Sequence, residues 1–169
     1  MRLLLFVIPL ALAMGQGRSI PVENEYVRVL SVTDQPVSKP GVLHEHKENR
    51  VMIYLDPGDI QIRYADGKAE NQHWKAGDVA WSPGGGMHTS QNVSSKPIRI
   101  VEIEVRSQGG AAAGKSAEKT LLDNPQVRVY RSSHRPAAKN FVAVDPVTAA
   151  VLWNRLPEGT GPFLITELK

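Results

Sequence analysis

Short segments rich in β-branched and aromatic residues, separated by turn residues, are the feature that most limits how this chain can fold. Asp56-Pro57-Gly58-Asp59 is typical of a tight turn, and Asp66-Gly67 predicts a hairpin of type I′. No window of about eleven residues after the N-terminal segment shows helical periodicity. The pattern predicts an all-β protein, a sandwich or a small barrel. The predicted strands are Tyr26–Val32, Val51–Leu55, Asp59–Tyr64, Asp78–Ser82, Thr89–Asn92 and Ile98–Val105.

The N-terminus reads MRLLLFVIPLALAMGQG. One positive charge, an apolar run from Leu3 to Met14 and the small residues Ala11 and Ala13 are typical of a secretory signal peptide. The run is too short for a transmembrane helix, which needs about 20 residues. We therefore expect residues 1–13 to be cleaved, leaving a secreted or periplasmic protein without a stable membrane anchor. The chain has no cysteine, which excludes disulfides and a lipid-anchoring cysteine.

Charge argues against a nucleic-acid partner. The chain of 169 residues has a formal net charge of only +3, and its lysines and arginines are scattered singly rather than gathered in runs. Binding to a phosphate backbone needs a focused basic face. A small-molecule ligand or substrate is the partner that we expect.

The second part of the chain resembles the first. Glu23–Leu30 is matched by Asp123–Tyr130, and Lys96–Ile103 is matched more loosely by Gly161–Leu168. We interpret residues 20–106 as one β unit, residues 107–118 as a small and polar linker, and residues 119–169 as an abbreviated, degenerate repeat. The alternative is a chance similarity between valine-rich strands.

Histidines in the first unit are the candidate chemistry. His44 and His46 are two residues apart, so in an extended segment both rings point to the same side. His88 follows a turn some forty residues later. Three neutral imidazoles that converge on one point make a reasonable site for a divalent transition metal. The alternative is that the same rings bind a polar ligand at the mouth of a barrel.

The spacing around His88 is more specific than the histidines alone. It reads G-x5-P-x-G-x2-H-x3-N, and in this form the chain resembles the second motif of the cupin superfamily. The matching residues are Gly77, Pro83, Gly85, His88 and Asn92. The resemblance covers roughly residues 24–106 and implies a jelly-roll β-barrel with an appended, abbreviated β unit. Many cupins dimerise, so it also allows a homodimer.

The first cupin motif, G-x5-H-x-H-x3,4-E-x6-G, is matched only in part. His44 and His46 fit its histidines and Gly58 fits its closing glycine, but the glutamate is missing. Arg50 or Val51 takes its place. The family commonly holds iron, manganese, nickel or zinc with three histidines and that glutamate, so the loss of the carboxylate puts the metal in question.

Three functional hypotheses remain open. The first is a three-histidine metal site of His44, His46 and His88, as some cupin dioxygenases use, with Glu48 as a substitute carboxylate ligand. The second is a metal-free barrel that binds a small polar or anionic ligand through the histidines and Arg50. The third is a barrel with a purely structural role.

Other residues receive structural interpretations. We expect Glu102 and Glu104 to face solvent, with Val101, Ile103 and Val105 packed inward; the alternative places both carboxylates inside the barrel as acid–base candidates. Trp74 and Trp81 are expected to pack in the core or at the barrel rim, and His73 to be exposed. In Trp81–His88 (WSPGGGMH), Pro83 and Gly84 are expected at the centre of a type II turn that brings His88 inward.

Overall fold

The structure, a computed structural model, describes residues 16–37, 39–107 and 119–169. The predicted signal peptide and nearly all of the predicted linker lie outside these residues. Within them the regular elements are all strands, and no helix is long and apolar enough to cross a membrane.

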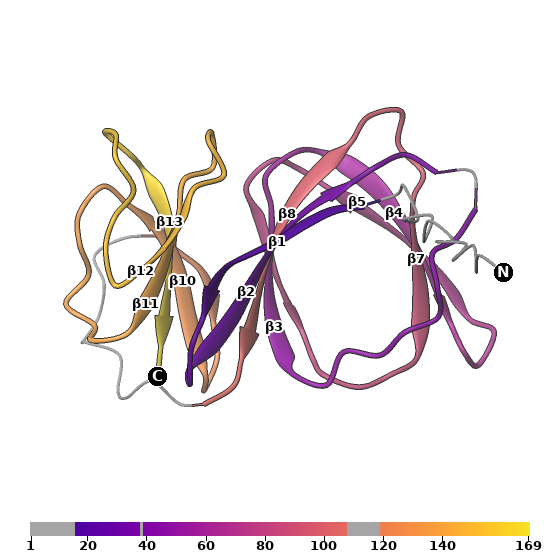
Figure 1. The fold of residues 1–169 in the computed structure, drawn as a ribbon, viewed down its shortest axis with the longest axis horizontal. Helices are drawn as coiled ribbons and strands as arrows, with labels where there is room; N and C mark the ends of the chain where they lie inside the picture. The colour runs from indigo at the N-terminus through magenta and orange to yellow at the C-terminus, as the bar shows by residue number, and fades with distance from the viewer. Residues whose placement is uncertain (1–15, 38, 108–118) are drawn as a thin grey trace, which may run out of the picture.

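The first unit contains eight strands in two sheets. A five-stranded sheet has the order β1-β2-β8-β3-β6, and a three-stranded sheet has the order β5-β4-β7. The sheets face each other and enclose the barrel on the right of Figure 1. The strands are β1 (Gln16–Glu23), β2 (Val27–Asp34), β3 (Asn49–Tyr54), β4 (Gly58–Tyr64), β5 (Ala69–Trp74), β6 (Asp78–Ser82), β7 (His88–Asn92) and β8 (Ile98–Val105).

This arrangement confirms the predicted all-β jelly-roll barrel. β6 and β8 have the predicted bounds, and the other predicted strands differ by one to three residues at their ends. The prediction of a type I′ turn at Asp66-Gly67 is wrong. Of these two residues only Gly67 has positive φ (87°), and its amide donates to the Tyr64 carbonyl at 3.0 Å. A type I′ turn needs positive φ at both central residues.

The second unit is a single five-stranded sheet of order β12-β11-β13-β10-β9. Its strands are β9 (Thr120–Asp123), β10 (Val127–Ser132), β11 (Phe141–Val144), β12 (Val151–Trp153) and β13 (Phe163–Leu168). Read from β9, the order β9-β10-β13-β11-β12 parallels β1-β2-β8-β3-β6 of the barrel, strand for strand. Both sheets are antiparallel throughout.

The turns that open the two sheets are also alike. The Asn24 side-chain oxygen accepts from the amides of Tyr26 (2.9 Å) and Val27 (3.0 Å). The Asn124 side-chain oxygen accepts from the amides of Gln126 (2.8 Å) and Val127 (3.0 Å). Each asparagine thus stabilises its turn through its own side chain. The resemblance between the two units is therefore present in backbone geometry and in strand order.

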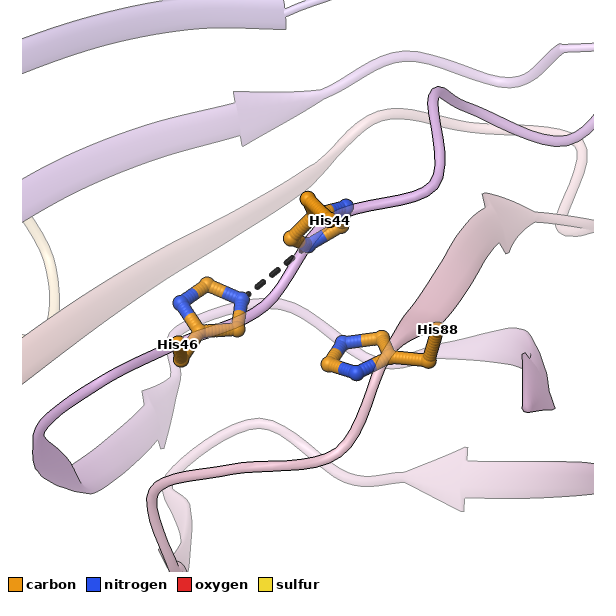
Figure 2. A group of neighbouring side chains, drawn as sticks. All are labelled: His44, His46 and His88. Carbon is orange, nitrogen blue, oxygen red and sulfur yellow. Dashed lines mark hydrogen bonds between the residues drawn. The ribbon is translucent and has the colours of Figure 1, made fainter. Parts of the chain in front are cut away.

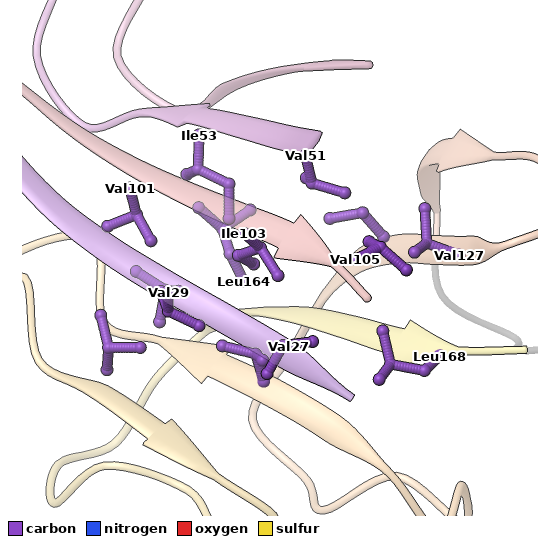
Figure 3. Packing of buried hydrophobic residues seen from close by; sticks show 14 of the residues in the cluster. Val27, Val29, Val51, Ile53, Val101, Ile103, Val105, Val127, Leu164 and Leu168 are labelled. Atoms are coloured by element: carbon purple, nitrogen blue, oxygen red, sulfur yellow. The ribbon is translucent and has the colours of Figure 1, made fainter. Parts of the chain in front are cut away.

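The two five-stranded sheets pack face to face through a layer of aliphatic side chains, shown in Figure 3. β1 lies against β12 and β6 lies against β9, so the edge strands of one sheet meet the opposite edge of the other. The fully buried members include Val29, Val51, Ile53, Val101 and Ile103 from the barrel, and Val127, Val129, Val142 and Leu164 from the second unit. Burial of this apolar area is the main force that joins the units.

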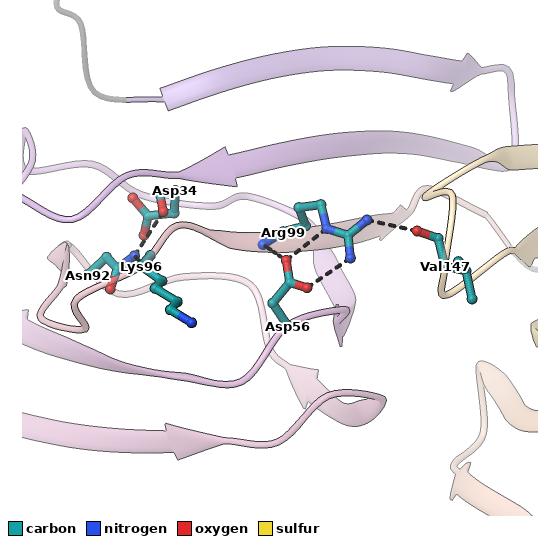
Figure 4. Close-up of polar contacts among 6 residues, drawn as sticks. All are labelled: Asp34, Asp56, Asn92, Lys96, Arg99 and Val147. Carbon is teal, nitrogen blue, oxygen red and sulfur yellow. Dashed lines mark hydrogen bonds and ion pairs between the residues drawn. The ribbon is translucent and has the colours of Figure 1, made fainter.

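Polar and aromatic contacts fix how the units meet. Arg99 makes a bidentate ion pair with Asp56 of its own unit (2.8 Å for each contact) and donates from Nη1 to the Val147 carbonyl of the second unit at 2.9 Å (Figure 4). Asn49 donates to Gln126 across the interface at 2.7 Å. The rings of Tyr26 and Trp153 stack with centroids 5.8 Å apart.

The expectation that Glu102 and Glu104 face solvent is wrong. Val101, Ile103 and Val105 do pack inward, but against the second unit rather than into the barrel. Because side chains alternate along a strand, Glu102 and Glu104 then point into the barrel. The same inner face of β8 carries Ile98 and Ile100, which pack with Leu30, Val32, Tyr54 and Ile60 in the barrel's own apolar core. Packing of the second unit on one face of β8 therefore leaves the other face to line the barrel interior.

We expect Ile103→Ala, in the interface between the units, to lower the free energy of unfolding by about 2–5 kcal/mol. Ile103 is fully buried, so the substitution leaves a cavity. Ile20→Ala is the matched control, because Ile20 is 44% exposed, and its effect should stay within about 0.5 kcal/mol. Urea unfolding followed by intrinsic tryptophan fluorescence measures both. Equal effects of the two substitutions would contradict the packing described here.

Candidate metal centre

The structure brings His44, His46 and His88 together, as Figure 2 shows. One potential ligand nitrogen from each ring lies within 4.8 Å of the others. The ring centroids are 4.7 Å (His44–His88), 4.8 Å (His44–His46) and 5.4 Å (His46–His88) apart. All three rings are partly buried. Three imidazole nitrogens at this spacing can bind one transition metal ion with modest adjustment.

The backbone places these rings through two extended segments. His44 and His46 precede β3, and His88 is the first residue of β7. His44 and His88 form an isolated antiparallel bridge in which each amide donates to the other's carbonyl at 2.9 Å. The Gly85 amide donates to the His46 carbonyl at 2.6 Å. Of His44 and His46, only His44 takes part in a β-bridge. These two rings therefore point to the same side from an extended segment rather than from a regular strand.

The glycine run before His88 has a different conformation from the predicted type II turn. Gly85 and Gly86 have positive φ (94° and 76°), whereas Gly84 does not. Gly84 is instead a point of close approach, because a Cβ there would lie 2.5 Å from the Lys47 carbonyl oxygen. The run therefore joins the His88 loop tightly to the segment that carries His46.

The second ring nitrogens fix two of the tautomers. Nδ1 of His44 lies 2.8 Å from the Val42 carbonyl, and Nδ1 of His88 lies 3.1 Å from the Gly86 carbonyl. A carbonyl only accepts, so in both rings Nδ1 carries the proton and Nε2 offers a lone pair. His44 Nε2 is 3.0 Å from His46 Nε2, so His46 donates in this contact. A metal ion at this point would replace that proton.

The surroundings of His46 and His88 favour the neutral form of these two rings. Burial lowers the pKa of His46 to about 3, with the positive charge of Arg50 and the neighbouring rings of His44 and His88 acting in the same direction. Burial also lowers the pKa of His88, although its hydrogen bond to the Gly86 carbonyl acts in the opposite direction. Metal binding requires neutral imidazole, so this environment favours a ligand role.

Arg50 takes the position of the missing glutamate and points into the barrel. It is only 5% exposed, while its neighbour Val51 is buried on the opposite face against the second unit. Arg50 Nη1 forms an ion pair with Glu102 at 3.0 Å, and Nη2 donates to the Ser82 hydroxyl at 2.9 Å. A cation thus stands near the three rings, balanced by a carboxylate from β8.

The other predicted residues lie outside this group. Glu48 is exposed in the loop before β3 and does not join the three histidines. His73 is exposed and contacts Asp59 at 2.7 Å. Trp74 stacks on Tyr54 with centroids 3.9 Å apart in the barrel core, and Trp81 packs against the interface between the units, as expected for both.

Glu102 is the residue of the site that sequence reasoning placed wrongly. The available signal was the apolar character of both units. The second sheet is too small to bury its own valines, so it must pack against an apolar face of the first sheet. The face of β8 that carries Val101 and Ile103 is the apolar face that it covers. That assignment turns Glu102 inward.

An open surface depression of about 400 Å³ lies next to the loop that carries His88. Its lining comes from the end of β4 and the following turn (Tyr64, Ala65, Asp66, Lys68) and from Gly86 and Met87, directly before His88. The Tyr64 ring centroid lies 6.2 Å from that of His88. Tyr64 and Met87 are exposed, so the depression offers an apolar group of a ligand a surface contact near His88.

Comparisons with known proteins identify the fold. No protein-family model matches the chain, and no curated protein matches it. Solved structures do match. A cupin domain from Bordetella pertussis Tohama I is 22% identical, covers 55% of this chain and 95% of its own, and has a TM-score of 0.50. An RmlC-like cupin family protein with a double-stranded β-helix fold from Methanocaldococcus jannaschii is 16% identical, covers 56% and 84%, and has a TM-score of 0.45.

The match to the Bordetella domain covers a share of the chain about as long as residues 16–107 and agrees with the jelly-roll strand order. Identity at this level shows the fold and leaves the substrate open. The first unit of this chain is a barrel of the cupin fold.

Proposed function

We propose that His44, His46 and His88 bind one divalent transition metal ion and that a small organic molecule binds beside it. The observation that carries the proposal is the convergence of three imidazoles, two of them with Nε2 lone pairs fixed by hydrogen bonds from Nδ1 to backbone carbonyls. Such fixing of the second ring nitrogen is typical of metal-binding histidines.

Iron, manganese, nickel and zinc are the candidate ions, because each accepts imidazole nitrogen. The chemistry that such an ion supplies when bound is Lewis-acid polarisation and orientation of the substrate. The chain's own residues do the rest. The carbonyls of Val42 and Gly86 orient two of the rings, and Tyr64 places an aromatic ring 6.2 Å from that of His88. Oxidation of a small organic substrate with dioxygen as the oxidant, as in a dioxygenase, is the reaction that we propose, in an exported protein.

A second candidate function is binding of a small polar or anionic ligand without a metal. The buried guanidinium of Arg50 favours it, because a cation near three neutral rings attracts an anion and opposes a metal cation. The ion pair with Glu102 reduces that opposition. The two candidates differ in one measurable property, the metal content of the folded chain.

Metal analysis decides between them. We expect the chain, purified without a histidine tag and reconstituted with iron, manganese, nickel or zinc, to hold one metal ion per molecule by elemental analysis. His88→Ala should lose the metal, because two imidazoles alone bind it weakly. His73→Ala is the matched control, since His73 is exposed and outside the group, and it should keep the metal.

Metal well below one ion per chain with all four elements would overturn the metal proposal and support the second candidate. Full metal retention in His88→Ala would show that the ligand set is wrong. The fold of each variant is checked by circular dichroism and by the thermal unfolding midpoint.

Acid should destabilise the metal-free protein. The pKa of His46 is 6.5 when unperturbed and about 3 in the folded chain, so between these values the unfolded chain binds a proton that the folded chain does not. The free energy of unfolding therefore falls as the pH drops from about 6.5 towards 3. The slope is at most about 1.4 kcal/mol per pH unit for one proton, and less because the ring is partly exposed.

Urea midpoints measured from pH 8 to pH 4.5 check this dependence. His46→Asn should flatten the acid side of the curve, whereas His134→Asn, a substitution of an exposed histidine in the second unit, should leave the curve as in the parent protein. A parent curve without an acid slope would contradict the proposed state of His46.

A further inference from the structure

A row of charged side chains crosses the inner face of the five-stranded sheet. Glu104 lies opposite Arg28 on one neighbouring strand and opposite Arg50 on the other. Arg28 forms an ion pair with Glu104 at 3.7 Å, and Arg50 forms one with Glu102 at 3.0 Å. Ser82 lies opposite Arg50 on β6 and accepts from its Nη2. The polar end of the barrel thus has two cations and two carboxylates beside the histidines.

Solvent reaches this row from inside the barrel. The outer face of the same sheet is closed by the second unit, with Val51, Val101 and Ile103 at 0% exposure. Glu102 nevertheless keeps 13% of its side chain exposed, and its inner-face neighbours Met52 and Ala80 are also only partly buried. Since the outer face is dry, this exposure belongs to the barrel interior. A small molecule therefore has a route to Arg50 and Glu102.

The guanidinium of Arg50 has hydrogen-bond donors that its present partners do not use. Its side chain is 6% exposed, Nη1 and Nη2 each make one contact, and Nε is buried without a hydrogen-bond partner in the described part of the chain. Glu102 touches the guanidinium through one oxygen only. A guanidinium binds a carboxylate best in the bidentate mode, through two parallel N–H groups. The pair in the structure is weaker than the one that Arg50 is able to form.

We propose that Arg50 is the carboxylate-binding residue of the barrel and that a ligand's carboxylate takes the place on Nη1 that Glu102 holds. This inference deepens the proposed function. It rests on that function in one respect, the position of the ligand's other end at the histidines. Glu102 keeps the buried cation paired while the site is empty of ligand. A buried cation with a displaceable carboxylate selects small carboxylic acids over neutral molecules of the same size.

The test is the binding of malonate, a small dicarboxylate, to metal-free protein, measured by isothermal titration calorimetry. Metal is removed with a chelator and the chelator by dialysis. Glu102→Gln removes the competing carboxylate, so malonate should bind roughly tenfold more tightly than to the parent protein. Arg50→Gln should abolish binding. Because Arg50→Gln leaves Glu102 unpaired, the double variant Arg50→Gln/Glu102→Gln is tested as well and should also fail to bind.

A surface ion pair supplies the matched controls. Arg106 and Glu23 form an ion pair at 2.7 Å with more exposed side chains, so Glu23→Gln and Arg106→Gln should leave malonate affinity within about twofold of the parent. Malonate affinity unchanged in Glu102→Gln, binding retained in the double variant, or no saturable binding by either the parent or Glu102→Gln would overturn the proposal. Metal takes no part in these titrations, so a failure to bind malonate would leave the metal proposal intact. A failure to bind metal would likewise leave the carboxylate-binding role of Arg50 intact.

Discussion

The aliphatic contact between the two five-stranded sheets is the interaction on which the rest of the structure depends. It buries Val51, Ile53, Val101 and Ile103 from one side of β3 and β8. Because the side chains of a strand alternate, burial of that face commits Arg50, Met52, Glu102 and Glu104 to the other. The charged row inside the barrel is thus a consequence of apolar packing outside it.

The site depends both on this orientation of the side chains and on the two tight loops that carry the histidines. The bridge between His44 and His88 and the contact of Gly85 with the His46 carbonyl hold the loops together, and two backbone carbonyls orient two of the rings. Buried charge is kept balanced, since Arg50 pairs with Glu102. An unpaired buried cation would be strongly destabilising. The replacement of a carboxylate by Arg50 in the first motif is therefore matched by a carboxylate on another strand.

Much of the barrel was predictable from the sequence, because its strands are short, β-branched and separated by turn residues. The three histidines were also predictable, since two extended segments at the spacings of the cupin motifs leave few ways to place the rings apart. Local pattern did not decide the direction of Glu102, because both faces of β8 are partly apolar and the choice between them depends on a sheet formed later in the chain, by residues 120–168. The turn type at Gly84 was missed for a similar reason, because the approach of Lys47 to Gly84 is a tertiary contact.

The strand order shared by the two sheets has a consequence for how this chain tolerates change. The second sheet lacks counterparts of β4, β5 and β7 among its described strands, and these are the strands of the barrel wall that bears His88. The strand that bears His88 is therefore separate from the sheets that pack, whereas Arg50 and Glu102 lie on the packing sheet itself. Substitutions in the histidine loops leave the valine layer intact, and substitutions in the second sheet do not touch the rings. Such a molecule can exchange one ligand for another over generations while its architecture stays the same.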